Sequence, residues 1–220
     1  MKHYLFAFLL ALTASLLIQH DAFAQKKSTK VSLSLGGGVN LSSAQVGGYY
    51  DRASNATSRF SFGFFADKKI KGGLSARSGF FYNGLGREYV QGYMGIPIPD
   101  PGDMHMQDEF NYFTIPLQVK YSFRDSPFSL YAGPQFSYLI NVTWRPESNT
   151  RSLITDQFQR SNVSAAGGLL CAFTNRFSMG FEYQSSIGSN LDEGYKANLP
   201  TDTKYELYAF SLRAFYKLSN

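Results

Sequence analysis

Few residues of this chain could take part in catalysis. Beyond the first 24 residues the only histidine is His105, which stands between Met104 and Met106 in a polar stretch. Paired with a serine, such a histidine would act as the base in the hydrolysis or transfer of an acyl group. A general base must lie within hydrogen-bonding reach of the proton that it removes, and the sequence offers His105 no fixed partner. We therefore predict a solvated loop histidine and no enzymatic activity.

The acidic residues around His105 could instead bind a metal ion. Asp100, Asp103 and Asp108 carry the oxygen ligands that calcium prefers, but the spacing of a calcium-binding loop is missing from the sequence. A solvated acidic loop is the simpler interpretation. The single cysteine, Cys171, can form no intramolecular disulfide and is expected to pack as a small apolar residue facing lipid. The sequence thus predicts neither a metal site nor a cofactor.

Another set of charged residues lies on the polar side of segments in which apolar and polar residues alternate. The set comprises Asp67, Arg77, Lys120, Glu182, Arg213 and Lys217. If the polar sides face a narrow interior, these charges are costly unless they are paired. The chemistry predicted for them is therefore electrostatic pairing, and it depends on the elements that hold them.

The segment Phe113–Phe123 shows what those elements are. Every second residue from Phe113 to Phe123 is large and apolar, whereas the residues between them are small or polar. A period of two predicts a β-strand with one apolar and one polar face. Its length of about ten residues is what a tilted strand needs to cross a bilayer.

Eight segments of this kind are predicted along the chain. They are Val31–Leu41, Phe60–Asp67, Leu74–Leu85, Phe113–Phe123, Phe128–Ile140, Val163–Phe173, Phe177–Ile187 and Tyr208–Leu218. Short turns alternate with longer loops, which are expected at residues 42–57, 86–109, 145–160 and 188–203. This alternation is typical of an up-and-down barrel with short periplasmic turns and long outer loops. Pro116 and Pro134 each remove a ladder hydrogen bond, so we expect a bulge or a local strand end near each.

Two environments could cover the apolar faces: the core of a soluble periplasmic ligand-binding barrel, or lipid. Lipid is favoured because the polar faces are rich in Ser, Gly and Asn rather than the Lys and Glu of a water-facing surface. Aromatic residues make up 16% of the chain, more than one small core could pack. We predict an all-β protein, an eight-stranded antiparallel up-and-down transmembrane β-barrel.

Residues 1–24 have the layout of a secretory signal peptide. Lys2 precedes the apolar run Leu5–Ile18, and Ala22-Phe23-Ala24 forms a cleavage signal before Gln25. Residues 25–220 then form one barrel domain. The net charge of +5 is spread thinly along the chain, so nucleic-acid binding is not expected.

Three runs of residues carry a resemblance to a known family. They are residues 112–117 (Tyr-Phe-Thr-Ile-Pro-Leu) with Lys120-Tyr121, the glycine-rich run Leu35-Gly36-Gly37-Gly38, and Tyr131-Ala132-Gly133-Pro134. In these runs the chain resembles the PorT-like outer-membrane β-barrel family of Bacteroidota. The resemblance implies a barrel of about this size in the outer membrane, and one member type supports protein secretion.

Eight strands leave an interior that side chains just fill, which disfavours a porin. We therefore predict a monomeric structural or interaction scaffold that acts through its outer loops. Its expected partners are outer-membrane lipid, the barrel-assembly machinery during biogenesis, and a protein bound at the loops. The alternatives are an outer-membrane lipid-modifying enzyme that depends on His105 and the soluble periplasmic barrel.

Strand spacing also predicts how the interior charges pair. Glu182 and Arg213 are about equally far from the middle of loop 188–203, so they should face each other across neighbouring strands. By the same argument Asp67 should meet Arg77, with Lys120 beside Arg77. We expect these charges to form a polar plug in the periplasmic half that closes the barrel to ions; the alternative is solvated charges in a wet interior.

Outward aromatic residues should mark the two membrane interfaces. Those next to short turns or the C-terminus, at the periplasmic interface, are Phe123, Phe128, Phe173, Phe177 and Tyr216. Those next to long loops, at the outer interface, are Tyr82, Tyr138, Trp144 and Tyr208.

Overall fold

Every alternating segment forms a β-strand in the computed structural model, which describes residues 31–47, 54–91, 104–146, 151–199 and 203–218. The predicted signal peptide, together with Asp100 and Asp103, lies outside the described residues. The eight long strands are β1 (Val31–Gly47), β2 (Ser54–Lys71), β3 (Leu74–Gln91), β4 (Met104–Ser122), β5 (Phe128–Pro146), β7 (Ser161–Ala172), β8 (Phe177–Ser186) and β9 (Lys204–Lys217).

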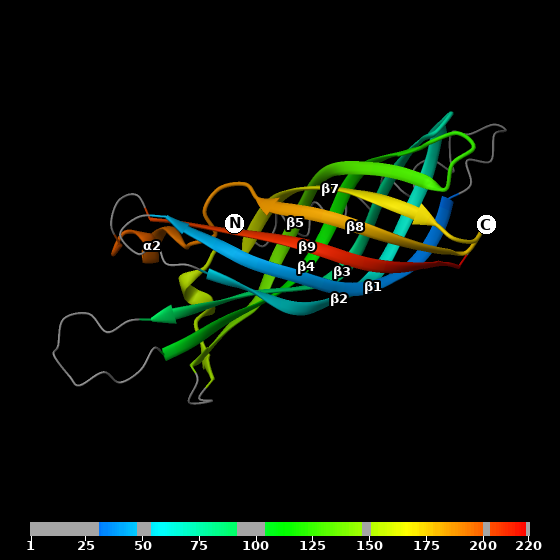
Figure 1. The fold of residues 1–220 in the computed structure, drawn as a ribbon. Helices are drawn as coiled ribbons and strands as arrows, with labels where there is room; N and C mark the ends of the chain where they lie inside the picture. The colour runs from blue at the N-terminus through cyan, green and yellow to red at the C-terminus, as the bar shows by residue number, and fades with distance from the viewer. Residues whose placement is uncertain (1–30, 48–53, 92–103, 147–150, 200–202, 219–220) are drawn as a thin grey trace. The chain divides into compact units, whose positions relative to one another are not determined.

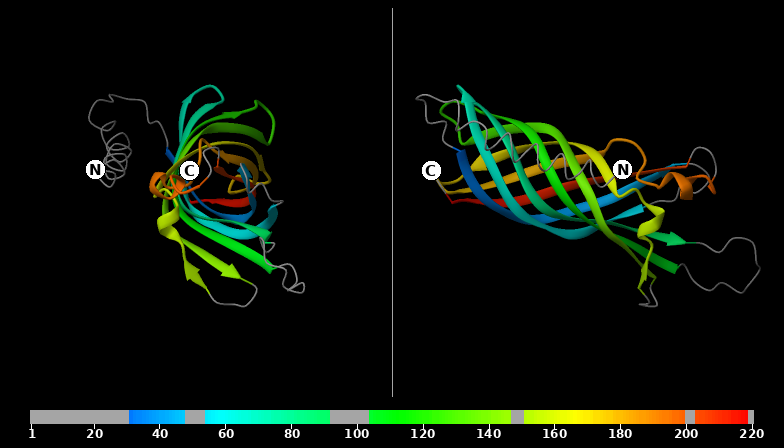
Figure 2. Two further views of the ribbon diagram at one scale, coloured as in Figure 1. Left: turned by 90° about the vertical axis from the view of Figure 1, so that its left-hand side faces the viewer. Right: turned by 180° about the vertical axis from the view of Figure 1, so that it is seen from behind.

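These strands close into a ring (Figures 1 and 2). Each pairs antiparallel with its neighbours in the chain, and β9 returns to pair with β1 from Ser34–Lys217 to Gly47–Lys204. The two-residue strand β6 (Ser152–Leu153) pairs only with β5. Two short helices, η2 (Thr155–Gln157) and α2 (Glu193–Lys196), lie in long connections. The predicted eight-stranded up-and-down barrel is confirmed.

The strands extend well beyond their apolar segments. The fourth strand begins at Met104 rather than Phe113 and contains 19 residues, and β5 also contains 19. Much of the predicted loops 42–57 and 86–109 is therefore strand. Ladder hydrogen bonds join backbone groups whatever the side chains are, so polar residues outside the apolar band continue the pairing.

Short connections gather at one end of the barrel, which we call the turn end, and longer ones at the other, the loop end (Figure 1). Two turn-end residues adopt positive φ: Gly72 at 58° and Asp125 at 56°. Glycine has no side chain to clash there, and aspartate is among the few other residues that tolerate this conformation. Short turns mark the periplasmic end of a bacterial outer-membrane barrel.

Pro116 and Pro134 do not cause the bulges expected near them. The pairs Pro116–Gln135 and Val119–Ala132 keep one register, with the two intervening pairs missing from the ladder. The register of these strands shifts instead between Asn111 and Tyr112, where Ile140 is left unpaired. A proline therefore opens a local gap in the ladder, whereas the bulge lies further toward the loop end.

The outward face of the barrel is apolar. Phe60, Phe62 and Phe64 on β2 have 74%, 63% and 54% of their surface exposed. Within the described residues, none of the helices has both the length and the apolar character to span a membrane. The polar side chains of each strand point into the barrel, and they form the candidate site.

Candidate functional site

The middle of the interior is organised around one buried ion pair. Arg213 of β9 approaches Glu182 of β8 with Nη1 2.6 Å from Oε1, and each side chain is 3% exposed. The two are diagonal neighbours, because Glu182 pairs with Ser211 and Arg213 with Gly180. Glu182 and Arg213, which the strand spacing predicts to face each other, thus lie within hydrogen-bonding reach.

Side chains from other strands complete the coordination of this pair. Gln118 of β4 and Gln135 of β5 each donate to Glu182 through Nε2 at 3.2 Å. Arg213 donates through Nε to the Ser61 hydroxyl of β2 at 3.1 Å. A buried ion pair is tolerated when further hydrogen bonds satisfy the groups that the pair leaves over. The network therefore ties strands on opposite sides of the barrel together.

Toward the loop end, amide side chains continue across the interior. Asn40 of β1 donates to Asn83 of β3 at 2.7 Å, and Asn83 donates to Gln184 of β8 at 3.3 Å. The Ser211 hydroxyl donates to Asn40 at 2.7 Å, which joins this chain to Arg213. Hydrogen-bonded side chains thus fill the central cross-section of the barrel.

The turn end of the interior is apolar. Each of its large side chains lies directly across the ladder from a glycine: Phe65 from Gly79, Phe81 from Gly63, Tyr131 from Gly168, Leu170 from Gly180 and Phe215 from Gly36. A Cβ atom added at Gly36 would lie 2.7 Å from the ring of Phe215, and one at Gly168 would lie 2.6 Å from Tyr131. Glycine provides the space in which each side chain lies.

Arg77 is held by this cluster. Its guanidinium lies 4.6 Å from the ring centre of Phe65, 4.7 Å from that of Phe215 and 5.1 Å from that of Tyr131, and the residue is 3% exposed. The faces of aromatic rings attract a cation strongly when both are shielded from water. Arg77 therefore closes the turn end together with the rings.

The predicted ion pair between Asp67 and Arg77 does not form. The two residues are directly opposite in the ladder of β2 and β3, but Asp67 Oδ2 lies 3.2 Å from Nζ of Lys120 on β4. The three rings draw Arg77 toward the barrel axis, which leaves Asp67 to the flexible Lys120. Lys217 lies half-buried at the turn-end rim, beside Ser34 in the ladder.

At the loop end, two long connections fold over the interior. Phe158 and Leu191 pair across them, and Asp192 N donates to Gln157 O at 2.9 Å. Phe158 meets Phe110 and Tyr205 edge to face, with centroids 4.9 and 5.2 Å apart. We call the buried group of Phe110, Phe158, Leu191 and Tyr205 the cap. It covers the outer opening of the barrel with apolar side chains.

A charged pair lies beside the cap, two residues further toward the loop end than Phe110 on β4. Arg87 Nε is 2.8 Å from Asp108 Oδ2, and the Tyr205 hydroxyl donates to the same oxygen at 3.2 Å. Asp108 is 2% exposed, so the predicted solvated acidic residue is in fact buried and paired. The interior thus carries an ordered series of apolar and ionic contacts from one end to the other.

Comparison with models of protein families shows which family this chain belongs to. A family model described as "Outer membrane protein beta-barrel domain" matches residues 23–192, which is more than half of the chain. The chain belongs to this family. The outward apolar face therefore lies in the lipid of the bacterial outer membrane.

Solved structures similar to this outer-membrane barrel include three bacterial surface proteins. Neisserial surface protein A is 15% identical, with a TM-score of 0.47, over 86% of this chain and 99% of that chain. Ail of Yersinia pestis is 13% identical, with a TM-score of 0.46, over 86% of this chain and 99% of that chain. OprG from Pseudomonas aeruginosa is 11% identical, with a TM-score of 0.43, over 87% of this chain and 97% of that chain. Likeness this distant carries no information on function. A comparison with curated proteins gives no match.

The outward aromatic residues of the outer-membrane barrel occupy both ends of its apolar band. At the turn end, between 39% and 60% of each predicted interface residue is exposed: Phe123, Phe128, Phe173, Phe177 and Tyr216. Toward the loop end, Tyr82 stacks on Phe62 and donates to Asn111, and Tyr138 and Tyr208 are half-buried.

Trp144 differs from the other predicted interface residues. It lies directly opposite Asp108 in the ladder of β4 and β5 and therefore shares the inner face with this buried carboxylate. The bulge at Ile140 reverses the alternation of the residues that follow it. Trp144, which the sequence pattern predicts to point outward, therefore points inward.

The remaining candidate residues show no catalytic arrangement. His105 Nδ1 lies 3.2 Å from Glu88 Oε1, and both side chains are well exposed. Among the described residues, no group of three His, Cys, Asp or Glu side chains could hold a metal ion. Cys171 pairs in the ladder with Phe128 and Met179 and is half-buried.

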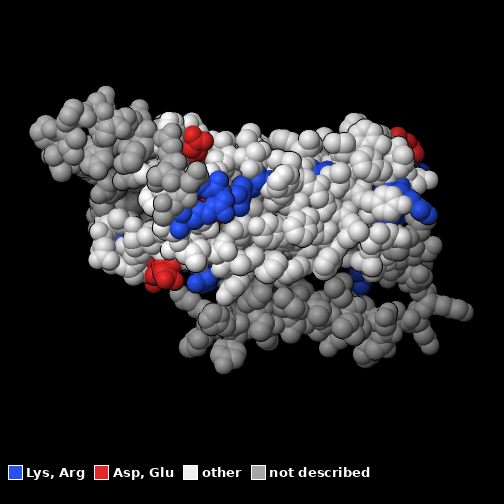
Figure 3. Space-filling model, turned by 90° about the horizontal axis from the view of Figure 1, so that it is seen from below, with Lys and Arg blue, Asp and Glu red and all other residues white. Residues whose placement is uncertain are grey.

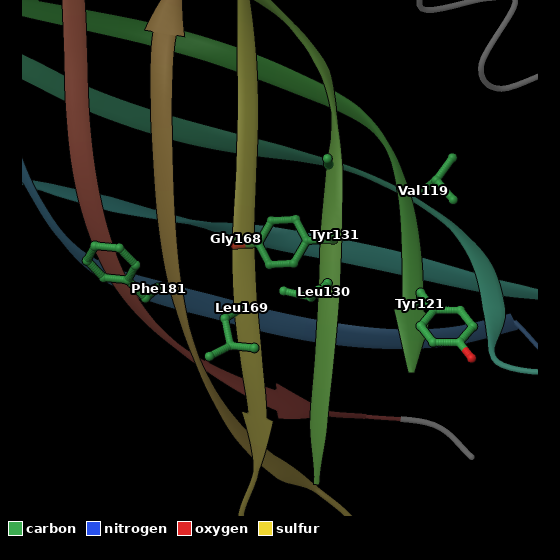
Figure 4. A pocket seen from close by; sticks show the side chains of 8 residues that line it. Val119, Tyr121, Leu130, Tyr131, Gly168, Leu169 and Phe181 are labelled. Carbon is green, nitrogen blue, oxygen red and sulfur yellow. The ribbon is translucent and has the colours of Figure 1, made fainter. Parts of the chain in front are cut away.

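A shallow hollow lies on the wall where small residues replace large ones. It is lined by Val119, Tyr121, Leu130, Tyr131, Ala132, Gly168, Leu169 and Phe181. Figure 4 shows the ring of Tyr131 beside Gly168. The lining is almost wholly apolar, which suits contact with lipid chains and offers no catalytic group.

Sequence reasoning missed the glutamines, the glycine–ring pairs and the cap. Gln118 and Gln135 stand on polar faces that the alternation already identifies, so their inward direction was predictable. The partner of each ring, by contrast, depends on the register between strands. The cap depends on how two loops fold, for which the sequence gives no periodic signal.

Proposed function

We propose that this outer-membrane barrel is a closed, non-porin scaffold that acts through its loop end. The observation that carries the proposal is the buried Arg213–Glu182 pair, which side chains from β2, β4 and β5 complete. The turn-end cluster lies on one side of this pair and the cap on the other. Ions would have to displace all three layers in order to pass.

The loop end offers surface for a partner because the wall is longer on one side. The strands β3, β4 and β5 contain 18, 19 and 19 residues, against 10 in β8. About 9–11 residues suffice to cross the membrane. The outer ends of β3 and β4 diverge from those of β1 and β9 at the lower left of Figure 1. These ends would present a rigid sheet outside the bilayer.

Planar-bilayer recording tests the closed interior, and crosslinking in cells tests the scaffold. The purified barrel should give no steady ion conductance, and a stable open level would contradict closure. A photo-crosslinking residue at Leu153, 73% exposed at the loop end, should capture a protein partner. The same photo-crosslinking residue in place of Phe60, which is 74% exposed in the lipid-facing band, should capture no protein partner. Equal capture at both positions would contradict a role for the loop end.

The resemblance to PorT-like barrels supports a more specific form of the proposal, a part in protein secretion. Deletion of the gene should then remove particular proteins from the secreted and surface fractions. Proteomes that deletion leaves unchanged would exclude this role while leaving the scaffold intact. Insertion by the barrel-assembly machinery as a monomer, after cleavage that leaves Gln25 at the N-terminus, belongs to the same proposal.

The enzymatic alternative depends on His105. The contact of this residue with Glu88 resembles the orienting contact of a general base, but both side chains are exposed and no nucleophile is placed beside them. His105→Ala should leave lipid composition and any lipid-modifying activity of outer-membrane extracts unchanged. Loss of such an activity would establish the alternative.

A further inference from the structure

Basic residues stand at all three short connections of the turn end. Lys68, Lys69 and Lys71 lie in the last residues of β2, next to its turn into β3; Arg124 lies between β4 and β5, and Arg176 between β7 and β8. We count the end of β2 with its turn and call residues 68–73, 123–127 and 173–176 the three connections. Their only acidic residue is Asp125, so their net charge is +4, from five basic and one acidic residue.

This charge is not neutralised within the described residues. The one ion pair in the three connections joins Arg124 to Asp125 at 4.0 Å, with side chains 96% and 92% exposed. A pair so exposed holds its charges together only weakly. Asp67, the carboxylate nearest the lysines in sequence, is engaged inside the barrel by Lys120. The described residues therefore offer these lysines no counter-charge.

The loop end differs in its balance of charge. Over its described residues (54–60, 84–91, 104–112, 140–146, 151–160, 186–199 and 203–208), seven Lys and Arg accompany seven Asp and Glu. In Figure 3 the two ends lie left and right as in Figure 1; basic side chains are seen at the right-hand, turn end and also over the left half of the barrel, and acidic ones near both ends. The described residues of the loop end thus carry no net charge, whereas the three turn-end connections carry +4.

The basic residues stand at the height of the membrane interface. The outward aromatic residues of the turn end begin directly beside the same connections, as Phe123, Phe128, Phe173 and Phe177 do. Arg176 Nη1 lies 3.4 Å from the hydroxyl of Tyr216, one of these interface residues. Aromatic belts mark the level of lipid headgroups. The cations therefore lie where headgroup phosphates are found.

We propose that the turn end binds the phosphate groups of anionic phospholipids in the leaflet around it. The three connections are distributed around the ring, since β2–β3, β4–β5 and β7–β8 occupy different parts of the strand order. A shell of lipid meets all of them at once, whereas a protein bound at one side of the barrel would not. Flexible lysine ammonium groups suit headgroups that exchange and reorient.

Lipid retention in nanodiscs tests the proposal. The purified barrel is reconstituted with equal amounts of phosphatidylglycerol and phosphatidylcholine, and the lipids that remain bound on release are counted by native mass spectrometry. The turn variant carries Lys68→Gln, Lys69→Gln and Lys71→Gln. The control carries Arg151→Gln, Lys196→Gln and Lys204→Gln, which removes the same charge from the loop end.

The native barrel should retain phosphatidylglycerol in preference to phosphatidylcholine. Each basic residue near an anionic surface contributes roughly a fivefold preference, so the turn variant should lose at least about tenfold and the control less than about twofold. Replacement of the same lysines by arginine should preserve the preference. Heat-dependent mobility on gels shows that each variant is folded.

Four results would overturn the proposal. One is equal retention of both lipids by the native barrel, and another is an equal loss in the turn variant and the control. The third is a native barrel whose preference for phosphatidylglycerol is lost when inorganic phosphate is added but is kept in potassium chloride of the same ionic strength. That result would indicate a site for free anions. The fourth is a turn variant that keeps the native lipid preference but no longer binds purified peptidoglycan as the native barrel does. That result would assign the surface to the cell wall instead.

Discussion

Replacement of Glu182 by alanine should destabilise the barrel by about 3–5 kcal/mol, the usual cost of breaking a buried ion pair from one side. The carboxylate accepts from Arg213 at 2.6 Å and from Gln118 and Gln135 at 3.2 Å each. Without it, the guanidinium of Arg213 keeps only neutral partners, the hydroxyls of Ser61 and Ser211 and the ring of Phe81. Because Arg213 is 3% exposed, water cannot replace the lost charge.

Urea unfolding of the barrel in lipid vesicles measures this cost. The protein contains one tryptophan, Trp144, whose fluorescence reports the transition, and gel mobility before and after boiling gives an independent measure. Glu182→Gln keeps the shape and one acceptor and should lose less than Glu182→Ala. The double variant Glu182→Ala/Arg213→Met should recover at least about 1 kcal/mol over Glu182→Ala, since it removes the unpaired charge.

A loss below about 1 kcal/mol for Glu182→Ala would refute this reasoning. So would a double variant whose loss equals the sum of the two single losses. Either result would mean that Arg213 is hydrated in a wet interior and that the pair contributes little to closure.

Three further substitutions test other layers of the interior. Gly168→Ala should cost about 1–3 kcal/mol in urea unfolding because its Cβ would lie 2.3 Å from the backbone oxygen of Phe181 and 2.6 Å from Tyr131. Gly167→Ala, with its nearest neighbour at 3.6 Å, should cost little, and equal losses would contradict the steric argument. A double-mutant cycle should give Asp67 a larger coupling energy with Lys120, on the order of 1 kcal/mol, than with Arg77, and the reverse order would contradict the observed pairing. Phe158→Ala should loosen the cap and raise hydrogen exchange at the loop end while leaving the turn end protected; uniform exchange would show that the two ends open together.

Much of this barrel follows from the period of two in its sequence. Alternation places Glu182 and Arg213 on the inner face, and the length of their connection brings them to neighbouring heights. Inward direction and approximate height are properties of single strands, which is why the sequence contains them. The strand ends are less predictable, because ladder pairing continues through polar residues once the apolar band has set the register.

The choice among neighbours depends on three-dimensional packing. Asp67 lies opposite Arg77 in the ladder but pairs with Lys120, because three rings from three other strands hold Arg77. Only the closed ring brings Phe65, Tyr131 and Phe215 to one point. Trp144 was misplaced for a local reason: one unpaired residue at Ile140 reverses the alternation, and no proline or glycine marks the bulge at that position.

The pairing of each ring of the turn-end cluster with a glycine bears on how the barrel reaches its register. Alternation of apolar and polar residues is unchanged when one strand slips by two residues, so it cannot reject that error. The glycines can. If β3 slipped by two residues along β2 in one direction, Phe81 would stand opposite Phe65, where both rings compete for one space. In the other direction Gly79 would face Gly63, and nothing would fill the gap. A slip of β7 along β5 would likewise set Leu170 or Ala166 against Tyr131. A barrel assembling in a membrane would thus recognise its correct register by shape, strand by strand, before the ring closes.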